Sequence, residues 1–440
     1  FERQREVLRR MWEDHYITRQ EYDTALSAQV KFASPRISIQ APHFVMYIRE
    51  LLENRYGPRL VEKGGLRVIT SLDVGIQKMA QEIVSSHISA LAALRVGNGA
   101  ALVTSPKTGE ILAMVGSRDY FDLEHDGNVN VTLSLRQPGS SIKVVTYAAA
   151  LENGLTAATI IHDTPVAYHI VGSPTYTPVN YDGRFHGATP LRYALANSYN
   201  VPAVKVLAQL GMEKMIDKGK AMGITSWNDS GRFGLSLTLG GGEVTMLDMA
   251  KVFGTLAHGG IRTDLLPILS VKDYTDRVLD QDTVGKQTQA VKPQVAWILS
   301  RILSDNTARS AAFGPNSSLV ISGKTVSVKT GTSNDKRDNW TIGYTPSFAV
   351  TVWVGNNDNS PMDPVLTSGV TGASPIWHDI MSKLLEGASD EKPNKPPDIV
   401  EVPCYFGRSE FFLTGTEPKN GRCGPLPTPT PTSGDSAQQP

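Results

Sequence analysis

Strand-forming segments occur at two widely separated places in this chain, with helix-forming sequence between them. The first is a hairpin pattern of apolar residues at 100–115, and the second covers 325–330, 340–343 and 348–354. Helical patterns dominate from 140 to about 260. Strands at both ends with helices between them predict one α+β domain, whose sheet is completed by strands that are distant in sequence.

The remaining patterns predict helices around this domain. Two short helices are expected within residues 1–32, and the second begins after Thr18, which forms a capping box with Glu21. A helix, a strand and another helix are predicted at 42–56, 66–72 and 74–94, and a last helix at 375–385.

Breaks in these patterns divide the chain into five parts. Gly97 and Gly99 separate the last N-terminal helix from the main domain, and a charged, proline-rich run covers 391–397. The expected parts are a helical N-terminal part (1–40), a linker or pedestal (41–97), the α+β domain (98–390), a small C-terminal module (391–424) and a disordered Pro/Thr-rich tail (425–440).

Charge and composition exclude several classes of protein. The 43 basic and 43 acidic residues balance, which gives no electrostatic argument for binding nucleic acid. No apolar stretch approaches the length of a membrane span, and the nine histidines show no metal-ligand spacing. Because the chain starts with Phe1, we interpret it as a fragment or processed product. Cys404 and Cys423 are compatible with free thiols or with a disulfide.

Ser140 and Lys143 form the first motif with catalytic potential, a serine followed three residues later by a lysine (SxxK). Pro138 and Gly139 interrupt regular structure before a helix-forming run, so Ser140 is expected near a helix N-terminus with Lys143 one turn further on. A serine hydroxyl needs a base to become a nucleophile, and a lysine can serve when its amine is kept neutral. Alone the motif is weak, and Ser333–Lys336 is a second copy.

Two further motifs follow Ser140 in order, Ser198-Tyr199-Asn200 (SxN) and Lys329-Thr330-Gly331-Thr332 (KTGT). The ordered set SxxK, SxN and KTG is the signature of penicillin-binding proteins and class A β-lactamases. Alternative copies of the last two motifs occur at 226–228, 304–306 and 107–109. The 107–109 copy lies in a tight turn before Glu110, which would repel a carboxylate. Lys329–Thr332 instead ends a strand and is suited to binding an anion beside a strand edge.

The flanks of these motifs extend the resemblance. From about residue 60 to 390 the chain resembles the class A penicillin-binding proteins, the bifunctional peptidoglycan synthases. The matching segments are 70–73, 108–114, 136–143, 196–202, 323–333 and 338–344. Family members often have an aromatic residue and a proline around the catalytic lysine, where this chain has Ile142 and Val144. Residues 1–40 resemble the end of the family's glycosyltransferase domain, whose catalytic part is not expected here, and 391–424 resembles an appendage of some members.

The resemblance implies a catalytic role for four residues. Ser140 would be the acylated nucleophile, and Lys143 would accept its proton. Ser198 would relay a proton to the leaving amine, and Lys329 would hold the charge of this network.

It also implies a substrate-binding role for the residues around them. Asn200 would hydrogen-bond the substrate amide. Thr330 and Thr332, with Gly331 between them, would bind the terminal carboxylate of a D-Ala-D-Ala stem peptide. The backbone N–H groups of Ser140 and Thr332 would form the oxyanion hole.

The family resemblance further implies a fold, a reaction and a location. The fold would be that of the penicillin-binding proteins and serine β-lactamases, an antiparallel sheet flanked by helices with an all-helical lobe and a preceding linker domain. The enzyme would cross-link peptidoglycan stem peptides through an acyl-enzyme, and β-lactams would acylate the same serine without any cofactor. It would act outside the bacterial cytoplasmic membrane, anchored by a segment not in this chain, which favours a Cys404–Cys423 disulfide.

Two other functions stay open at this stage. A β-lactamase or D,D-carboxypeptidase would use water instead of an amine to release the acyl group. A penicillin-binding sensor or wall-anchored scaffold would be acylated without turnover. The linker and the tail of a synthase favour transpeptidation, whereas the C-terminal module could serve scaffolding in either case.

Overall fold

The computed structural model divides into two compact units, 1–40 and 41–440. The residues that it describes are 2–28, 39–169, 174–363 and 371–426. Within these ranges, no helix has both the length and the apolar character that crossing a membrane requires.

The first unit is a pair of helices, α1 (Glu2–Glu13) and α2 (Arg19–Ser27). The Thr18 hydroxyl accepts a hydrogen bond from the Glu21 backbone N–H, and the Glu21 carboxylate accepts one from the Thr18 backbone N–H. The predicted capping box is therefore confirmed. Neither helix contains a buried residue among those that the structure describes.

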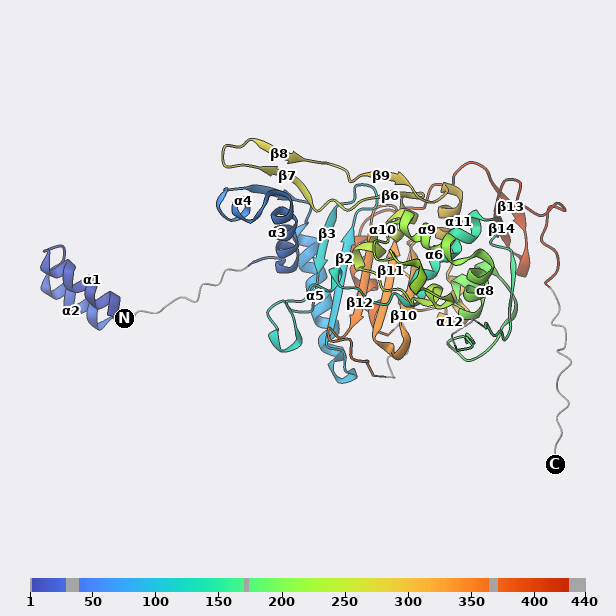
Figure 1. Ribbon diagram of the computed structural model, residues 1–440, viewed down its shortest axis with the longest axis horizontal. Helices are drawn as coiled ribbons and strands as arrows, with labels where there is room; N and C mark the ends of the chain where they lie inside the picture. The colour runs from blue at the N-terminus through green and yellow to red at the C-terminus, as the bar shows by residue number, and fades with distance from the viewer. Residues whose placement is uncertain (1, 29–38, 170–173, 364–370, 427–440) are drawn as a thin grey trace, which may run out of the picture. The chain divides into compact units, whose positions relative to one another are not determined.

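An antiparallel five-stranded sheet forms the centre of the second unit (Figure 1). Its strands, in spatial order, are β10 (Ser327–Thr332), β11 (Asp338–Tyr344), β12 (Ala349–Gly355), β2 (Asn98–Thr104) and β3 (Ile111–Val115). β12 pairs with β2 over all seven residues of both strands. The two sequence-distant groups of strands thus form one sheet, and the predicted α+β fold is confirmed.

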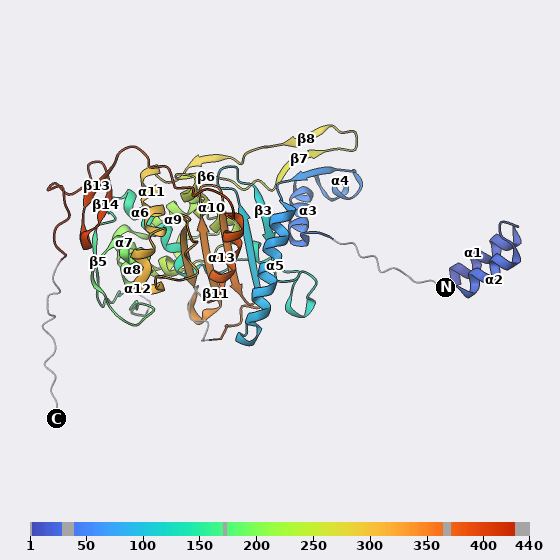
Figure 2. The ribbon, with the colours of Figure 1, turned by 180° about the vertical axis from the view of Figure 1, so that it is seen from behind.

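Helices cover both faces of this sheet, as the opposite views of Figures 1 and 2 show. α5 (Val74–Leu91) and α13 (Ala373–Leu384) pack on one face, and α10 (Met246–Ala257) and α11 (Pro293–Leu303) on the other. Within β12, Val350, Val352 and Val354 belong to the apolar cluster of the first face, whereas Ala349 and Trp353 belong to that of the second. The strand is therefore apolar at nearly every position instead of alternating.

A helical lobe adjoins the β10 end of the sheet. Its helices are α6 (Lys143–Glu152), α7 (Leu191–Ala196), α8 (Asn200–Leu210), α9 (Met212–Met222) and α12 (Asn306–Phe313). Two short paired strands, β4 (Ile160–Asp163) and β5 (Gly187–Pro190), interrupt the stretch that was predicted as helical. Each has only four residues, too few to give a period-2 signal. The 3₁₀ turns are η1 (Ala92–Leu94), η2 (Leu123–His125), η3 (Val131–Leu133), η4 (Gly139–Ile142), η5 (Ser230–Arg232), η6 (Leu235–Leu239), η7 (Asn334–Lys336) and η8 (Tyr405–Gly407).

The N-terminal part of the second unit carries a separate sheet. α3 (Pro42–Tyr56) and α4 (Pro58–Lys63) precede β1 (Arg67–Thr70), which pairs with β7 (Ile268–Lys272), and β7 pairs with β8 (Val278–Gln281). β6 (Ile261–Thr263) pairs with β9 (Gln287–Gln289). Helix α3 has the predicted bounds, but the strands between 261 and 289 were not predicted. They are short, and all three residues of β9 are exposed, so they carry no apolar alternation.

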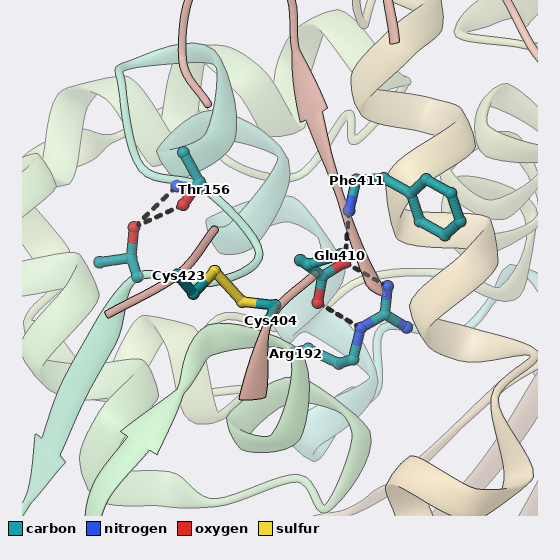
Figure 3. The surroundings of a disulfide bond; sticks show 7 residues. Thr156, Arg192, Cys404, Glu410, Phe411 and Cys423 are labelled. Carbon is teal, nitrogen blue, oxygen red and sulfur yellow. Dashed lines mark hydrogen bonds and ion pairs between the residues drawn. A yellow bond between two sulfur atoms is a disulfide. The ribbon is translucent and has the colours of Figure 1, made fainter. Parts of the chain in front are cut away.

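The C-terminal part forms a hairpin, β13 (Ile399–Pro403) and β14 (Ser409–Leu413). A disulfide joins Cys404, which follows β13, to Cys423, with an S–S distance of 1.95 Å (Figure 3). Most of the predicted disordered tail, residues 427–440, lies outside the described residues.

Candidate active site

The three sequence motifs are carried by elements that meet at the edge strand β10. Ser140 lies in η4, which leads directly into α6. Ser198 follows α7, Asn200 begins α8, and Lys329–Thr332 form the last part of β10. Because η4 contacts β10 and α6 contacts α8, the fold brings motifs together that are far apart in sequence.

The turn that carries Ser140 lies directly on β10 because glycines allow the approach. A Cβ atom on Gly139 would lie 2.5 Å from the carbonyl oxygen of Thr332, and one on Gly331 would lie 2.2 Å from that of Pro138. Gly139 also has a φ of +54°, in the left-handed region that glycine adopts without strain. Glycine at these two positions is therefore what sets the backbone of Ser140 beside that of Thr332.

Lys143 is fully buried and directs its amine at the SxN motif. Nζ donates to the carbonyl oxygen of Ser198 at 2.6 Å, to that of Tyr199 at 3.1 Å and to Oδ1 of Asn200 at 2.7 Å. All three acceptors are neutral, so these contacts hold the amine in place without supplying a negative charge.

Lys329 approaches Ser198 from the strand side. Its Nζ donates to Oγ of Ser198 at 2.8 Å and to the carbonyl oxygen of Thr330 at 2.9 Å. The side chain is 3% exposed. Ser198 is thus held between two buried lysines, one on its backbone carbonyl and one on its hydroxyl.

Both amines have lowered pKa values because of burial. Burial lowers the pKa of Lys143 well below 10.5, and the positive charge of Lys329 lowers it further. Burial, together with the charge of Arg309, lowers the pKa of Lys329 to about 7. A neutral lysine amine can accept a proton from a serine hydroxyl, which an ordinary surface lysine at neutral pH cannot do.

We expect the free energy of unfolding to rise with pH above about 7, in part because of Lys329. The unfolded chain keeps this amine protonated up to about pH 10.5, whereas the folded chain releases the proton above about pH 7, so the unfolded chain binds more protons in this window. The substitution Lys329→Met should lower the slope of the unfolding free energy against pH by up to about 1.4 kcal/mol per pH unit.

Urea denaturation at several pH values between about 7 and about 9.5 measures this slope. The matched control is Lys220→Met, because Lys220 is exposed on α9 and should leave the slope unchanged. An identical slope for Lys329→Met and the native chain would show that Lys329 stays protonated in the folded state.

Ser140 differs from the serine that follows it. Its side chain is partly exposed, and its hydroxyl has no hydrogen-bond partner among the described residues. The Ser141 hydroxyl is buried and donates to the Pro138 carbonyl oxygen at 2.7 Å. The predicted one-turn spacing to Lys143 is present, but the Lys143 amine is hydrogen-bonded to the SxN segment, not to Ser140.

Ser198 has a φ of +61°, an uncommon conformation for a residue other than glycine. Such backbone strain persists where the surroundings fix it, and it is concentrated at functional sites. Here the two lysines hold Ser198, and Asn180 holds the start of α8 by accepting from the backbone N–H groups of Asn200 at 2.8 Å and Val201 at 3.1 Å.

The predicted substrate-binding residues line the same region. The Asn200 amide also donates to the Val179 carbonyl oxygen at 3.0 Å, which uses one of its two N–H groups. Thr330 is 6% exposed, and Thr332 is partly exposed at the end of β10. β10 is the edge strand of the sheet, so one side of Thr330–Thr332 has no partner strand within it.

The alternative motif copies lie elsewhere. Lys107–Gly109 is a turn between β2 and β3, and Asp305 of the 304–306 copy caps α12. The Ser226 hydroxyl donates to the Glu243 backbone, and the Ser333 hydroxyl donates to Asn334. The Ser226 and Ser333 hydroxyls are thus engaged with backbone carbonyl oxygens, whereas the Ser198 hydroxyl accepts from the Lys329 amine.

Sequence reasoning missed two residues that shape the site. Asn180 caps α8, and Arg309, 5% exposed, adds positive charge near Lys329. Neither belongs to a motif, and no sequence signal marks them. Among the described residues, no group of three or more His, Cys, Asp or Glu side chains is placed to hold a metal ion.

Comparison with known proteins identifies relatives of this chain. Residues 99–382 match the family model "Penicillin binding protein transpeptidase domain". The chain is 28% identical over 95% of its length to penicillin-binding protein 2D of Bacillus subtilis, of which it covers 62%, and 30% identical over 86% of its length to penicillin-binding protein 1B of Vibrio cholerae, of which it covers 48%. The chain therefore spans about half the length of these curated relatives.

Solved structures share the fold. Penicillin-binding protein 1A of Haemophilus influenzae matches with a TM-score of 0.81 at 21% identity, over 95% of this chain and 82% of that one. The PonA1 protein of Mycobacterium tuberculosis, in complex with penicillin V, matches with a TM-score of 0.68 at 24% identity, over 81% and 96%. Because the family model covers more than half of the chain and contains all three motifs, this chain belongs to the penicillin-binding protein transpeptidase family.

Proposed function

We propose that this chain is a serine D,D-transpeptidase that cross-links peptidoglycan stem peptides through an acyl-enzyme on Ser140. The observation that carries the proposal is the placement of Ser198 between two buried lysines, whose pKa values are lowered, beside the turn that holds Ser140. Ser140 supplies the nucleophile and Lys143 a neutral base. Ser198 supplies a hydroxyl that lies between Lys143 and strand β10.

In the first half-reaction, Oγ of Ser140 attacks the carbonyl carbon between the two D-Ala residues of a donor stem peptide. Lys143 accepts the hydroxyl proton, and the negative charge on the carbonyl oxygen is stabilised by the backbone N–H groups of Ser140 and Thr332. The C–N bond then breaks, and the terminal D-Ala leaves as an amine after receiving a proton through Ser198. An ester between Ser140 and the peptide remains.

In the second half-reaction, the amine of another stem peptide attacks this ester. Its proton passes back through the same groups to Oγ of Ser140, and the new amide joins two strands. Lys329 keeps the Ser198 hydroxyl oriented in both steps, through the 2.8 Å hydrogen bond that it donates to Oγ. A β-lactam enters the same first step and leaves its opened ring on Ser140.

The edge strand provides the substrate-binding surface. An extended peptide can pair with the unpartnered edge of a sheet, and β10 offers such an edge along Thr330, Gly331 and Thr332. The hydroxyls of Thr330 and Thr332 would bind the terminal carboxylate. The second N–H group of the Asn200 amide would donate to a carbonyl of the donor peptide.

We further propose that the reaction takes place on the extracytoplasmic side of the bacterial membrane. The Cys404–Cys423 disulfide supports this location, because disulfides persist in oxidising compartments. The solved relative in complex with penicillin V supports β-lactams as ligands. Membership of this chain in a bifunctional synthase stays a prediction from the sequence.

The proposal is tested by measuring two reactions of the native chain. Intact-mass spectrometry after incubation with a labelled penicillin should show one labelled adduct per molecule, and peptide mapping should place it on the segment that contains Ser140. A peptide ending in D-Ala-D-Ala, supplied with an amine acceptor, should release D-Ala and form the amide product. Chain treated beforehand with unlabelled penicillin is the control for both.

Each other result identifies a different function. Release of D-Ala with water as the only acceptor would indicate a carboxypeptidase, and consumption of the drug with a short-lived adduct would indicate a β-lactamase. A lasting adduct without peptide turnover would indicate a sensor or scaffold. Absence of any adduct on the folded chain would contradict the assignment of Ser140.

A further inference from the structure

The C-terminal hairpin is joined to the helical lobe by a buried ion pair. Glu410 of β14 faces Arg192 of α7, and Figure 3 shows the two side chains aligned in a bidentate contact. Nε of Arg192 donates to Oε2 at 2.6 Å, and Nη2 donates to Oε1 at 2.5 Å. Each of the two residues is 5% exposed. A buried ion pair adds little net stability compared with apolar residues, but breaking one is costly, so it fixes the position of its partners.

The ion pair extends to the start of α12 through Asp305. The Asp305 carboxylate accepts from Arg192 at 3.3 Å and from Arg408, next to β14, at 2.6 Å. Its other oxygen accepts from the backbone N–H of Ala308 at 3.0 Å and so caps α12. The hairpin thus contributes one acidic and one basic side chain to a four-charge network that contacts both α7 and α12.

α7 and α12 are the helices that hold the segment before Ser198. Ala196 ends α7, and the next residue, Asn197, donates from Nδ2 to the Ala308 carbonyl oxygen at 2.8 Å and accepts from the Ala312 N–H at 3.0 Å. Ser198 follows in its strained left-handed conformation. The network therefore fixes α7 on one side of this segment and α12, which binds Asn197, on the other.

Aromatic contacts reinforce the same attachment. The ring of Phe406, in the loop of the hairpin, lies 5.0 Å from that of Tyr193 on α7, edge to face. The ring of Phe411 on β14 lies 4.9 Å from that of Trp297 on α11, also edge to face. Pairs of this geometry stabilise a contact beyond the area that they bury.

We propose that the C-terminal hairpin positions Ser198 for acylation, and that Glu410 is the positioning residue through which it acts. This inference rests on the proposed role of Ser198 in proton transfer. Loss of the Glu410 charge would leave Arg192 buried without its bidentate partner, so α7 would shift to solvate the guanidinium and Ser198 would move relative to Lys143 and Lys329. A displacement of about 1 Å in such a site lowers a rate by up to about 100-fold.

The test compares acylation of the full chain by a penicillin in the native protein and in Glu410→Gln, which keeps the size of the side chain. Stopped-flow measurements over a range of drug concentrations give the rate constant at saturation, and intact mass gives the acylated fraction. We expect the rate constant to fall by about 10-fold or more while the acylated fraction stays complete. Glu410→Asp, which keeps the carboxylate, should recover most of the rate.

A matched control lies in the same part of the chain. Glu417→Gln makes the same chemical change at a partly exposed residue, whose carboxylate accepts from the Gly415 N–H at 2.6 Å. No hydrogen bond or ion pair joins Glu417 to α7 in the part of the chain that the structure describes. It should leave the rate constant unchanged. If Glu410→Gln does not fold, Phe406→Ala decides the question, because this residue is 64% exposed and the substitution removes the ring contact that joins the hairpin to Tyr193 of α7. A smaller fall in the same rate constant is then expected.

The outcomes separate this inference from the proposed function. If the native chain is not acylated, the proposed function fails. If the native chain is acylated and Glu410→Gln, or Phe406→Ala in its place, reacts at the native rate, the positioning role is refuted. A fall in the acylated fraction with an unchanged rate constant would show that Glu410 contributes to folding stability alone. This result would also refute the positioning role.

Discussion

Replacing Ser140 by alanine should abolish covalent labelling by a β-lactam, whereas replacing Ser141 by alanine should leave it in place. Removing a serine nucleophile eliminates the ester itself, so the expected loss is at least about 10⁴-fold. Ser141→Ala removes only the hydrogen bond that this hydroxyl donates to Pro138, which costs about 1 kcal/mol of stability.

Intact-mass spectrometry with a labelled penicillin measures both variants. The two serines are adjacent and carry the same functional group, so any difference between the variants is due to the position of the hydroxyl and not to its chemistry. Labelling of the folded Ser140→Ala chain at the native rate would place the nucleophile elsewhere. Loss of labelling in Ser141→Ala, with the fold intact, would show that exposure of the hydroxyl is not what selects the nucleophile.

Replacing Lys143 by methionine or by arginine should lower the acylation rate constant on the order of 10³-fold. Methionine has similar length but no basic group. Arginine keeps a positive charge, but its guanidinium stays protonated and cannot accept the proton of Ser140. The predicted loss in both variants follows from the lowered pKa of Lys143, which makes the neutral amine the reactive form.

Stopped-flow acylation by a chromogenic cephalosporin measures this rate constant. Lys205 is the matched control, because it lies on α8 and donates to the backbone of His162 and to Thr164 without contact to the motifs. Lys205→Arg should react at the native rate. If Lys143→Arg retained the native rate while Lys143→Met lost it, Lys143 would act through its positive charge, and another group would have to be the base.

The lysines show how far local sequence can describe a site. The order of the three motifs identifies Ser140, Lys143 and Lys329, but the lowered pKa values come from complete burial and from the charges of neighbouring residues. Burial of these amines depends on α6, α8 and β10 packing together, which no window of sequence contains. The same applies to Asn180, which lies outside every motif. Its side-chain amide oxygen accepts from the backbone N–H of Asn200, twenty residues later in the chain at the start of α8.

The sequence by itself determined the local elements and the chemistry of the motifs. Thr18 and Glu21 set the start of α2, and apolar β-forming runs gave β11 and β12, because these features depend on neighbouring residues. Only the tertiary structure decided that β7 pairs with β1, that Ser198 is strained between two lysines and that Glu410 binds Arg192. These arrangements join residues that are distant in the chain, and their free energies arise from burial and from long-range electrostatics, neither of which local patterns specify.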